Sequence, residues 1–356
     1  MTDTRQRAYA LRARFAQMGA QVVEPPVLQP AGLLLDLYGE DIRGRAYVTS
    51  DALRGEQMLR PDFTVPVVQM HMAHGAEPAR YTYAGEVFRR QEDDPERASE
   101  YLQVGYEVFD RTDAAAADAE VFALIAEVTA PLGLRASTGD IGILMAAVDG
   151  LDTSDRRKAA LRRHIWRPRR FRALLDRFSG RVAQPETRGA LLAGKTATDA
   201  PLTGLRSQAE IDARIAALRA DAAEPPIAAA QMECLDALLN VRETLPFALS
   251  QLHDLSVDLP AIRPAVKRLD ARAKALAARQ IDIDSLEFET SYGRTSMEYY
   301  DGFVFGFYAD GRPDLPPVAS GGRYDALTRR LGQGAEIPAV GAVIRPGLLV
   351  DLEQAQ

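Results

Sequence analysis

Two segments of alternating side chains, separated by a charged stretch, restrict the fold of this chain more than any other feature. RYTYAGEVFRR (residues 80–90) and YLQVGYEVFD (residues 101–110) alternate with the period of β-strands, and QEDDPERASE between them is typical of a loop. In the second segment, one face is apolar and carries Leu102, Val104, Tyr106 and Val108. The other face carries Tyr101, Gln103, Gly105, Glu107 and Phe109. The sequence therefore predicts two paired strands, one of which presents an amide and a carboxylate on either side of a glycine.

The polar face has the composition of a surface that binds a small zwitterion. Side chains at positions i and i+4 of a strand share a face about 13 Å apart, so Gln103 and Glu107 are expected to line one concavity. Gly105 between them would let a ligand approach the backbone. If the first strand pairs alongside, Arg89 falls on the same face. A guanidinium, an amide and a carboxylate suit an amino acid, and the alternative is a solvated sheet face with a cross-strand Arg–Glu pair.

The remaining elements indicate an α+β fold. Helical spacing of apolar residues predicts helices at 4–18, 64–75, 113–133 and 326–332. Strand character returns at 284–293, 297–311 and 337–344. Strand groups that flank helices without regular β–α–β alternation favour an antiparallel sheet with helices packed on it. Residues 150–280 are rich in Ala, Arg, Leu and Glu, so we expect a core from 1–149 and 281–356 with a mostly helical insertion between.

The composition restricts the cellular compartment and the binding partners that we expect for this chain. The net charge of −7 gives no general reason to bind nucleic acid, which disfavours tRNA as a partner. The single cysteine, Cys234, excludes an internal disulfide and fits a reducing compartment. The N-terminus lacks the apolar stretch of a signal peptide, and no run of about 18 apolar residues predicts a membrane span. A cytoplasmic protein is expected.

One short motif is interpreted as a false match. GALLAGKT (residues 189–196) fits the phosphate-binding loop pattern, with Lys195 at the expected position. That loop works only where a strand precedes it and a helix begins at the lysine, so that backbone amides converge on a phosphate. The preceding GRVAQPETR is no buried strand, and Pro201 soon interrupts any helix. A helix end followed by a loop is the better interpretation.

The histidines do not predict a metal site. His71 and His74 are three residues apart on an expected helix, which is close to a zinc-ligand spacing. No cysteine or glutamate motif accompanies them, and zinc sites need at least three protein ligands. We expect no metal and no cofactor.

Four motifs in order resemble the catalytic core of histidyl-tRNA synthetase, a class II synthetase. They are LRPDFTVPV, YAGEVFRRQEDDPERASEYLQVGYEVF, MEYYDGFVFGFY and ASGGRYDAL. The resemblance spans roughly residues 5–149 and 284–349 and implies a synthetase-like antiparallel sheet flanked by helices. It also implies a homodimer formed through the motif from Glu24 to Pro30.

The resemblance also implies a histidine-binding set. By the family pattern, this set comprises Asp62, Thr64, Arg89, Gln103, Glu107, Tyr299 and Tyr300. Thr64, Gln103 and Glu107 match positions that hold the amino acid, and Arg89 matches an arginine that contacts the ATP and adenylate phosphate. Asp62 stands where the family has a glutamate.

The chain departs from the synthetase pattern at positions that take part in the chemical step. The residues Thr295-Ser296-Met297-Glu298 stand where the family has Arg-Gly-Leu-Asp, and Arg294 lies one position away, which would re-aim its side chain. Leu348 replaces the arginine that clamps ATP, and Ser99 replaces another usual arginine. Losing such cations around a transferring phosphate costs orders of magnitude in rate. The chain also ends just after the last motif, so no anticodon-binding domain is expected.

This combination resembles the regulatory subunits of short-form ATP phosphoribosyltransferase, which begins histidine biosynthesis. That resemblance implies a non-catalytic subunit that assembles with a small catalytic subunit in a hetero-octamer, activates it and takes part in feedback inhibition by histidine. The alternative is a divergent synthetase-like enzyme that still forms an aminoacyl adenylate, which Arg89 and Arg294 favour. A third interpretation, a nucleotide-hydrolysing switch, would depend on Lys195.

Overall fold

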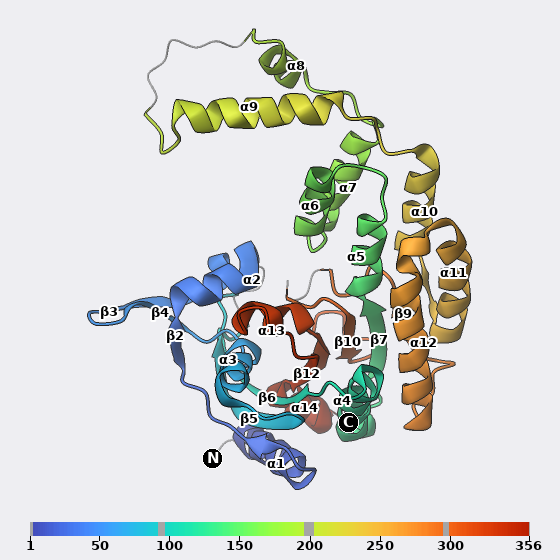
Figure 1. Ribbon diagram of the computed structural model, residues 1–356. Coiled ribbons are helices and arrows are strands. Elements are labelled where there is room, and N and C mark those ends of the chain that lie inside the picture. Colours follow the sequence, from blue (N-terminus) through green and yellow to red (C-terminus); the bar gives the residue numbers. More distant parts are fainter. Residues whose placement is uncertain (1–2, 92–96, 196–202, 295–298, 356) are drawn as a thin grey trace.

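A large mixed sheet forms the centre of the molecule (Figure 1). The computed structural model describes residues 3–91, 97–195, 203–294 and 299–355, and the side chains at 33, 36, 38–41 and 43 are not described. Among these residues, nine strands form one sheet in the order β1-β5-β6-β12-β11-β10-β7-β9-β8. Their bounds are β1 Gln21–Val22, β5 Ala79–Phe88, β6 Glu100–Phe109, β7 Arg135–Asp140, β8 Arg242–Thr244, β9 Glu287–Glu289, β10 Phe303–Tyr308, β11 Ala319–Arg323 and β12 Ala339–Ile344.

The two alternating segments form the predicted antiparallel pair. In the register of β5 and β6, Tyr81 lies opposite Glu107, Tyr83 opposite Gly105, and Gly85 opposite Gln103. β6 continues the sheet through β12, where Gly341 lies opposite Glu107. The residues of the polar face therefore lie in the middle of the sheet.

The expectation of a purely antiparallel sheet is corrected at its two ends. β1 pairs with β5 in parallel, and β7 pairs with β9 in parallel. The strands between them, from β5 to β7, are all antiparallel neighbours. The parallel pairs involve strands of two or three residues, which are too short to show the alternation that a sequence pattern reveals.

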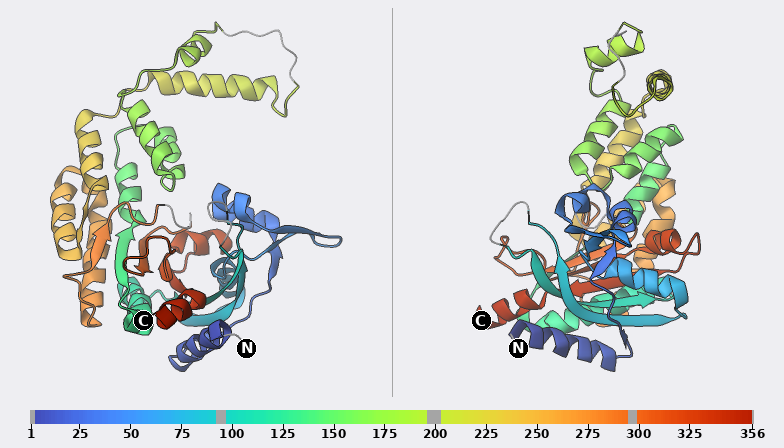
Figure 2. Two further views of the ribbon diagram at one scale, coloured as in Figure 1. Left: turned by 180° about the vertical axis from the view of Figure 1, so that it is seen from behind. Right: turned by 90° about the vertical axis from the view of Figure 1, so that its left-hand side faces the viewer.

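Helices cover both faces of the sheet (Figures 1 and 2). On the apolar face lie α1 (Asp3–Gln17), α4 (Ala114–Thr129) and α14 (Pro346–Ala355), with Phe15 of α1 against Tyr106 and Phe122 of α4 against Phe305. On the opposite face, α3 (Thr64–His74) packs beside α13 (Asp325–Leu331). A short 3-10 turn (Ala130–Leu132) and Gly133 in the left-handed conformation end α4, as predicted for 113–133.

A second, smaller sheet projects from the core. It has the strand order β2 (Leu28–Pro30), β4 (Gly55–Leu59), β3 (Val48–Asp51), and α2 (Ala31–Arg45) packs against it. Leu28 and Val48 on this sheet are exposed. The motif from Glu24 to Pro30 therefore ends in strand β2.

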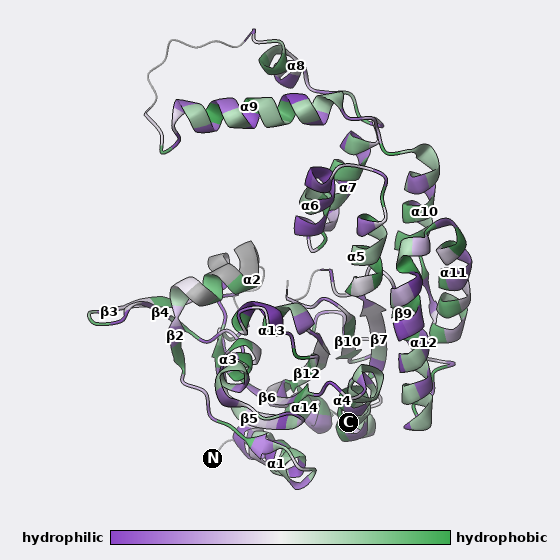
Figure 3. Cartoon of the chain, in the orientation of Figure 1, coloured by the Kyte–Doolittle hydropathy of each residue, from purple (hydrophilic) through white to green (hydrophobic). Residues whose placement is uncertain are grey.

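The region from 150 to 280 is mostly helical, as predicted. It follows α5 (Ile141–Asp149) and contains α6 (Asp155–Arg163), α7 (Pro168–Phe178), α8 (Glu186–Leu192), α9 (Gln208–Ala223), α10 (Ala229–Leu239), α11 (Leu245–Asp258), a 3-10 turn (Pro260–Ile262) and α12 (Arg263–Ala278). β8 also belongs to this region and forms the outer strand of the main sheet beside β9. Helices α8 and α9 extend away from the sheet in every view, and α9, described throughout, buries none of its residues (Figures 2 and 3).

Helix α12 is joined to the sheet by buried ion pairs. Arg272 donates to Asp118 Oδ2 of α4 and to Asp140 Oδ2 at the end of β7, both at 2.8 Å. Arg323 of β11 donates to Asp118 Oδ1 at 2.7 Å, and Arg272 also lies over the Phe303 ring. Removing one partner of a buried ion pair of this kind strongly destabilises a protein, because the other charge is left buried without compensation. This side of the helical region is therefore tied to the core.

Two predicted strands are shorter than the sequence indicated. The segment 284–293 forms only β9, and the segment 297–311 forms only β10, with 297 and 298 outside the described residues. Tyr299, Tyr300 and Asp301 precede β10, and the carboxylate of Asp301 accepts hydrogen bonds from the backbone of Asp325 and Ala326 at the start of α13. Among the described residues, no helix has the length and apolar character needed to cross a membrane.

Candidate functional site

Glu107 is the centre of a buried polar cluster. Its side chain is 1% exposed and accepts hydrogen bonds from Thr64 Oγ1 (3.1 Å), Tyr83 OH (2.7 Å) and Tyr324 OH (2.5 Å). These partners come from the start of α3, from β5 and from the residue that precedes α13. A Cβ on Gly341 would lie 1.5 Å from Glu107 Oε2, so the carboxylate lies directly on the backbone of β12. Only glycine fits at position 341, because any larger residue would overlap the Glu107 carboxylate.

The protonation of Glu107 is poised near neutral pH. Burial raises the pKa of Glu107 to about 7, although the hydrogen bonds from Tyr324, Tyr83 and Thr64 lower it, and the nearby Asp62 raises it. Burial also holds the pKa of Tyr83 and of Tyr324 well above the ordinary tyrosine value, so both phenols remain donors. The cluster is therefore a carboxyl group held by three hydroxyl donors.

The expectation for Gly105 is corrected. A Cβ on Gly105 would lie 2.1 Å from the Tyr83 ring, so a tyrosine and not a ligand fills the space above this backbone. The Tyr83 ring is stacked on Phe63 with centroids 4.2 Å apart. The sequence correctly places a residue without a side chain at position 105 of the strand. The cross-strand neighbour Tyr83, however, covers this backbone.

Gln103 keeps an unused acceptor. The residue is 1% exposed, and its Oε1 is buried without a hydrogen-bond partner. Its cross-strand neighbour Gly85 is covered by Arg60, whose guanidinium stacks on Phe63 at 3.9 Å. Buried side-chain oxygens nearly always have a partner, so an unpartnered one indicates a place where a ligand or water would donate.

Arg89, Asp62 and the two tyrosines form a neighbouring group. Arg89 follows the end of β5, donates to the carbonyl of Pro61 (2.6 Å) and lies 3.8 Å from Asp62 Oδ2. Tyr299 OH donates to the same oxygen of Asp62 at 3.3 Å, and the rings of Tyr299 and Tyr300 are 4.9 Å apart. The sequence placed Arg89 on the strand face, whereas it lies just beyond the strand.

The structure brings these predicted residues onto one face of the sheet. Tyr299 and Tyr324 pack edge to face at 6.2 Å, and this contact connects the Asp62 group with the Glu107 cluster. The residues that sequence analysis missed include Tyr324 and Arg60. Tyr324 lies within the quoted motif ASGGRYDAL, and an aromatic hydroxyl there was the available signal.

Thr64 lies at the start of its helix. α3 begins at Thr64, and the preceding Phe63 makes no side-chain cap hydrogen bond. The Thr64 hydroxyl donates to Glu107. The helix ends at His74, within the predicted range 64–75.

A cavity of about 640 Å³ adjoins the Arg89 side of this face. Its lining includes Arg45, Arg89, Arg97, Arg345 and Leu348. Arg345, three positions before Leu348, lines the same cavity, so the surroundings of Leu348 carry positive charge. Arg345 donates to the carbonyl of Pro317, and burial lowers its pKa, with Arg89 and Arg97 adding to the effect.

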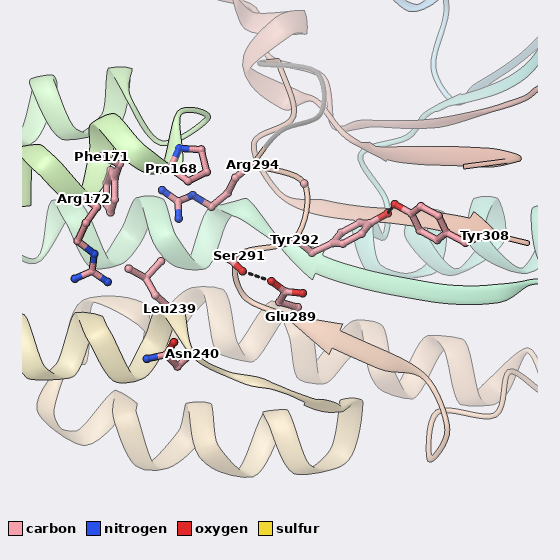
Figure 4. A pocket seen from close by; sticks show the side chains of 11 residues that line it. Pro168, Phe171, Arg172, Leu239, Asn240, Glu289, Ser291, Tyr292, Arg294 and Tyr308 are labelled. Atoms are coloured by element: carbon pink, nitrogen blue, oxygen red, sulfur yellow. Dashed lines mark hydrogen bonds between the residues drawn. The ribbon is translucent and has the colours of Figure 1, made fainter. Parts of the chain in front are cut away.

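Arg294 lies in a different place. As expected from its shifted position, it turns away from the family site: its Nε donates to the carbonyl of Ile165 at 2.8 Å, and its guanidinium lies 4.8 Å from the Phe171 ring centroid. It lines a separate cavity of about 520 Å³ next to α7 (Figure 4). The residues 295–298 that follow it lie outside the described part of the chain.

The GALLAGKT motif lies at the end of a helix, and His71 is buried among aromatic rings. Gly189 lies within α8, Gly194 follows the helix in the left-handed conformation (φ 72°), and Thr196 lies outside the described residues. The buried His71 stacks on Phe109 (4.0 Å) with its Nδ1 3.0 Å from Tyr81 OH. In the described residues, no group of three or more His, Cys, Asp or Glu side chains could hold a metal.

Comparisons with known proteins agree with this fold. The family model of histidyl-tRNA synthetase matches residues 2–220 and 207–346. The ATP phosphoribosyltransferase regulatory subunit of Brucella anthropi is 31% identical over 358 residues, a match that covers 93% of each chain. The protein of the same name from Brucella ovis is 31% identical over 361 residues and is also matched over 93% of each chain.

Solved structures share the architecture. An ATP phosphoribosyltransferase regulatory subunit/histidyl-tRNA synthetase from Bacillus halodurans superposes with a TM-score of 0.68 at 20% identity, covering 98% of this chain and 79% of that one. A histidine–tRNA ligase subunit from Alicyclobacillus acidocaldarius gives 0.63 at 23% identity, covering 99% and 93%. The α+β, class II synthetase-like fold is thereby established. On its sequence matches, the chain belongs to the histidyl-tRNA synthetase-like family of ATP phosphoribosyltransferase regulatory subunits.

Proposed function

We propose that this chain is the regulatory subunit of ATP phosphoribosyltransferase in histidine biosynthesis and performs no chemistry itself. The support is the match to regulatory subunits along nearly the whole chain. The chain would bind the catalytic subunit in a hetero-octamer built on a homodimer. The exposed residues Val27 and Leu28, within the segment Glu24 to Pro30, are suited to the homodimer contact.

Histidine is the proposed ligand of the face that carries Gln103 and Glu107. The observation that carries this proposal is the buried Gln103 Oε1 without a partner, on the same strand as a carboxyl group held by three hydroxyl donors. An ammonium group or ring N–H of histidine would satisfy the amide oxygen, and Glu107 in its charged form would attract a cation. Asp62, Thr64, Arg89, Tyr299 and Tyr300 complete the proposed site.

Binding of histidine would be coupled to the catalytic subunit. A coupling of about 1–3 kcal/mol between two sites is reciprocal for binding. Histidine that loads this face would therefore change the affinity between the subunits, and the catalytic subunit would change the affinity for histidine by the same factor.

Calorimetric titration tests the proposed site. Histidine should release or absorb heat on binding to the chain, alone or with the catalytic subunit, and Gln103→Met should weaken binding about tenfold, the effect of losing one hydrogen bond of about 1.4 kcal/mol. Gln208→Met, on the exposed surface of α9, serves as the matched control. Absence of binding in both settings would remove the histidine site but leave the activating role intact. That role is tested by co-expression, sizing and phosphoribosyltransferase assay.

A second function, formation of an aminoacyl adenylate, is favoured by the arginines around the 640 Å³ cavity. Arg89, Arg97 and Arg345 supply positive charge of the kind that stabilises a transferring phosphate. Histidine-dependent ATP–pyrophosphate exchange distinguishes the two functions. Exchange that is lost in Arg345→Met would replace the non-catalytic assignment, whereas a regulatory subunit shows none.

A further inference from the structure

Between helix α7 and the turn after β9 lies a cavity that the proposed function does not use. Its volume is about 520 Å³. Pro168, Phe171 and Arg172 of α7 form one end, Leu239 and Asn240 at the end of α10 form the floor, and the 289–294 segment closes it with Tyr308 (Figure 4). The helical region and the sheet core thus both contribute to its walls.

Arg294 is a buried cation without a counter-ion in this cavity. The residue is 6% exposed, and its Nη2 is buried with no hydrogen-bond partner. Its Nε donates to the carbonyl of Ile165, which is a neutral acceptor. Within the described residues, no carboxylate forms an ion pair with it. A buried charge that is not paired is costly, and a guanidinium edge is shaped to bind two oxygens of one oxyanion.

A second arginine adds positive charge at the same end. Arg172 lines the cavity, and its side chain comes from α7 while that of Arg294 comes from the 289–294 turn (Figure 4). Burial lowers the pKa of Arg294 to about 10, and the charge of Arg172 contributes. Arg294 is therefore still charged at neutral pH, beside a cation that repels it. Arg172 has a partner outside the cavity lining, the carboxylate of Asp236, which Arg181 shares.

The opposite end of the cavity has different chemistry. Glu289 accepts a hydrogen bond from the Ser291 hydroxyl, and the hydroxyls of Tyr292 and Tyr308 are 2.8 Å apart. Glu289 lies nearer to Arg242, at 3.9 Å, than to the arginines of the other end. The cavity is therefore cationic beside α7 and rich in hydroxyl groups and carboxylate beside β9.

We propose that this cavity binds a small metabolite through a carboxylate or phosphate group, which the free edge of Arg294 and the side chain of Arg172 receive. The site is distinct from the Glu107 face and does not depend on the histidine proposal. A ligand here would touch the helical region and the sheet core together, so its binding would stabilise their contact by mass action.

Anion titration of the full chain tests the proposal. Inorganic phosphate and succinate serve as the phosphate and carboxylate probes, and sodium chloride at equal ionic strength controls for screening. Phosphate, succinate or both should raise Tm above the chloride control, and the responding probe identifies the ligand class. Arg294→Met should abolish that rise and weaken the binding measured by calorimetry at least tenfold. Arg312→Met, at an exposed ion pair, should leave both unchanged.

The unliganded stability provides a second measurement. Because Arg294 is buried without a counter-ion, Arg294→Met should be no less stable than the natural chain in chloride alone. If that variant does not fold, Arg172→Met, at a partly exposed position, should still reduce the anion response severalfold. The proposal is overturned if neither probe exceeds chloride, or if the response survives both substitutions.

Discussion

At the residue scale, the behaviour of the site follows from burying a glutamate among hydroxyl groups. The three donors to Glu107 are uncharged hydroxyl groups, so its environment favours the neutral form more than an ion pair would. The carboxyl is therefore able to change charge near neutral pH.

This protonation predicts a pH dependence of stability. The pKa of Glu107 rises from its ordinary value of 4.5 to about 7 on folding, so between these values the folded chain holds a proton that the unfolded chain has released. The contribution of Glu107 to the free energy of unfolding is therefore fully present below pH 4.5. It decreases by about 3 kcal/mol as the pH rises through 7. Denaturant titrations at several pH values should show a smaller loss for Glu107→Gln.

The control for this measurement is Glu127→Gln, at an exposed ion pair on α4, which should keep the natural pH profile. Asp301 also has a pKa raised to about 7 by burial and by Asp325, so part of the decline should persist in Glu107→Gln. An unchanged profile in Glu107→Gln would contradict the assigned environment of the carboxyl.

Substitution of Gly105 tests the close packing of the face. A Cβ there would overlap the ring of Tyr83, which also donates to Glu107, so Gly105→Ala should lower the free energy of unfolding by about 1–3 kcal/mol. Gly189→Ala, in helix α8 with open space around it, should be neutral or slightly stabilising. Chemical denaturation of both variants provides the comparison, and equal stabilities would disprove the overlap.

At the element scale, a few buried ionic contacts join helices to the sheet. Asp118 of α4 receives both Arg272 of α12 and Arg323 of β11, so one carboxylate connects three elements. Phe303, over whose ring Arg272 lies, packs against Phe122 of α4. The connection between α12 and the core is therefore polar at its centre.

Removing that carboxylate should loosen α12. Asp118→Asn leaves two buried guanidinium groups with less compensation and should cost about 3–5 kcal/mol. Hydrogen exchange should speed up in α12 more than in β5 and β6. Asp314→Asn, at the exposed pair with Arg312, should change stability by less than about 0.5 kcal/mol. A comparable loss in both variants would argue against the structural role of Asp118.

At the scale of the whole molecule, a sheet core carries a helical region whose outer helices, α8 and α9, extend away from it (Figure 1). Among the described residues, the buried side chain of Arg157 connects α9 to α6, and the exposed Arg156 of α6 also donates to the carbonyl of Ala217 in α9. Arg157 of α6 donates to Asp221 Oδ1 (2.9 Å), to the carbonyl of Asp221 (2.6 Å) and to the carbonyl of Pro225 (2.7 Å). Arg188 of α8 donates to the other carboxylate oxygen of Asp221.

Arg157→Met should therefore release α8 and α9 while the sheet stays folded. Hydrogen exchange in α9 should accelerate at least tenfold, and limited proteolysis should cleave this region faster, because the three hydrogen bonds from Arg157 are lost. Exchange in β5 and β6 should remain as in the natural chain. Arg54→Met, at an exposed position in the turn between β3 and β4, is the control. Protection of α9 that survives in Arg157→Met would contradict this assignment.

Local patterns in the sequence determined much of the fold. The alternation at 80–90 and 101–110, the helical spacing around α1 and α4, and the glycine that ends α3 were sufficient because each depends on neighbours within a few residues. The composition of 150–280 likewise predicted helices. The quoted motifs also contain the residues of the proposed histidine site.

Only the tertiary structure decided whether the polar face is open or filled. Tyr83 covers Gly105 because the register of β5 and β6 places them opposite each other, and Tyr324 reaches Glu107 from the far side of β12. The tertiary structure also decided that Arg345 supplies charge beside Leu348 and that Arg294 turns toward α7. The charge state of a buried group and the direction of a long side chain depend on residues distant in the chain, and a linear pattern does not contain those contacts.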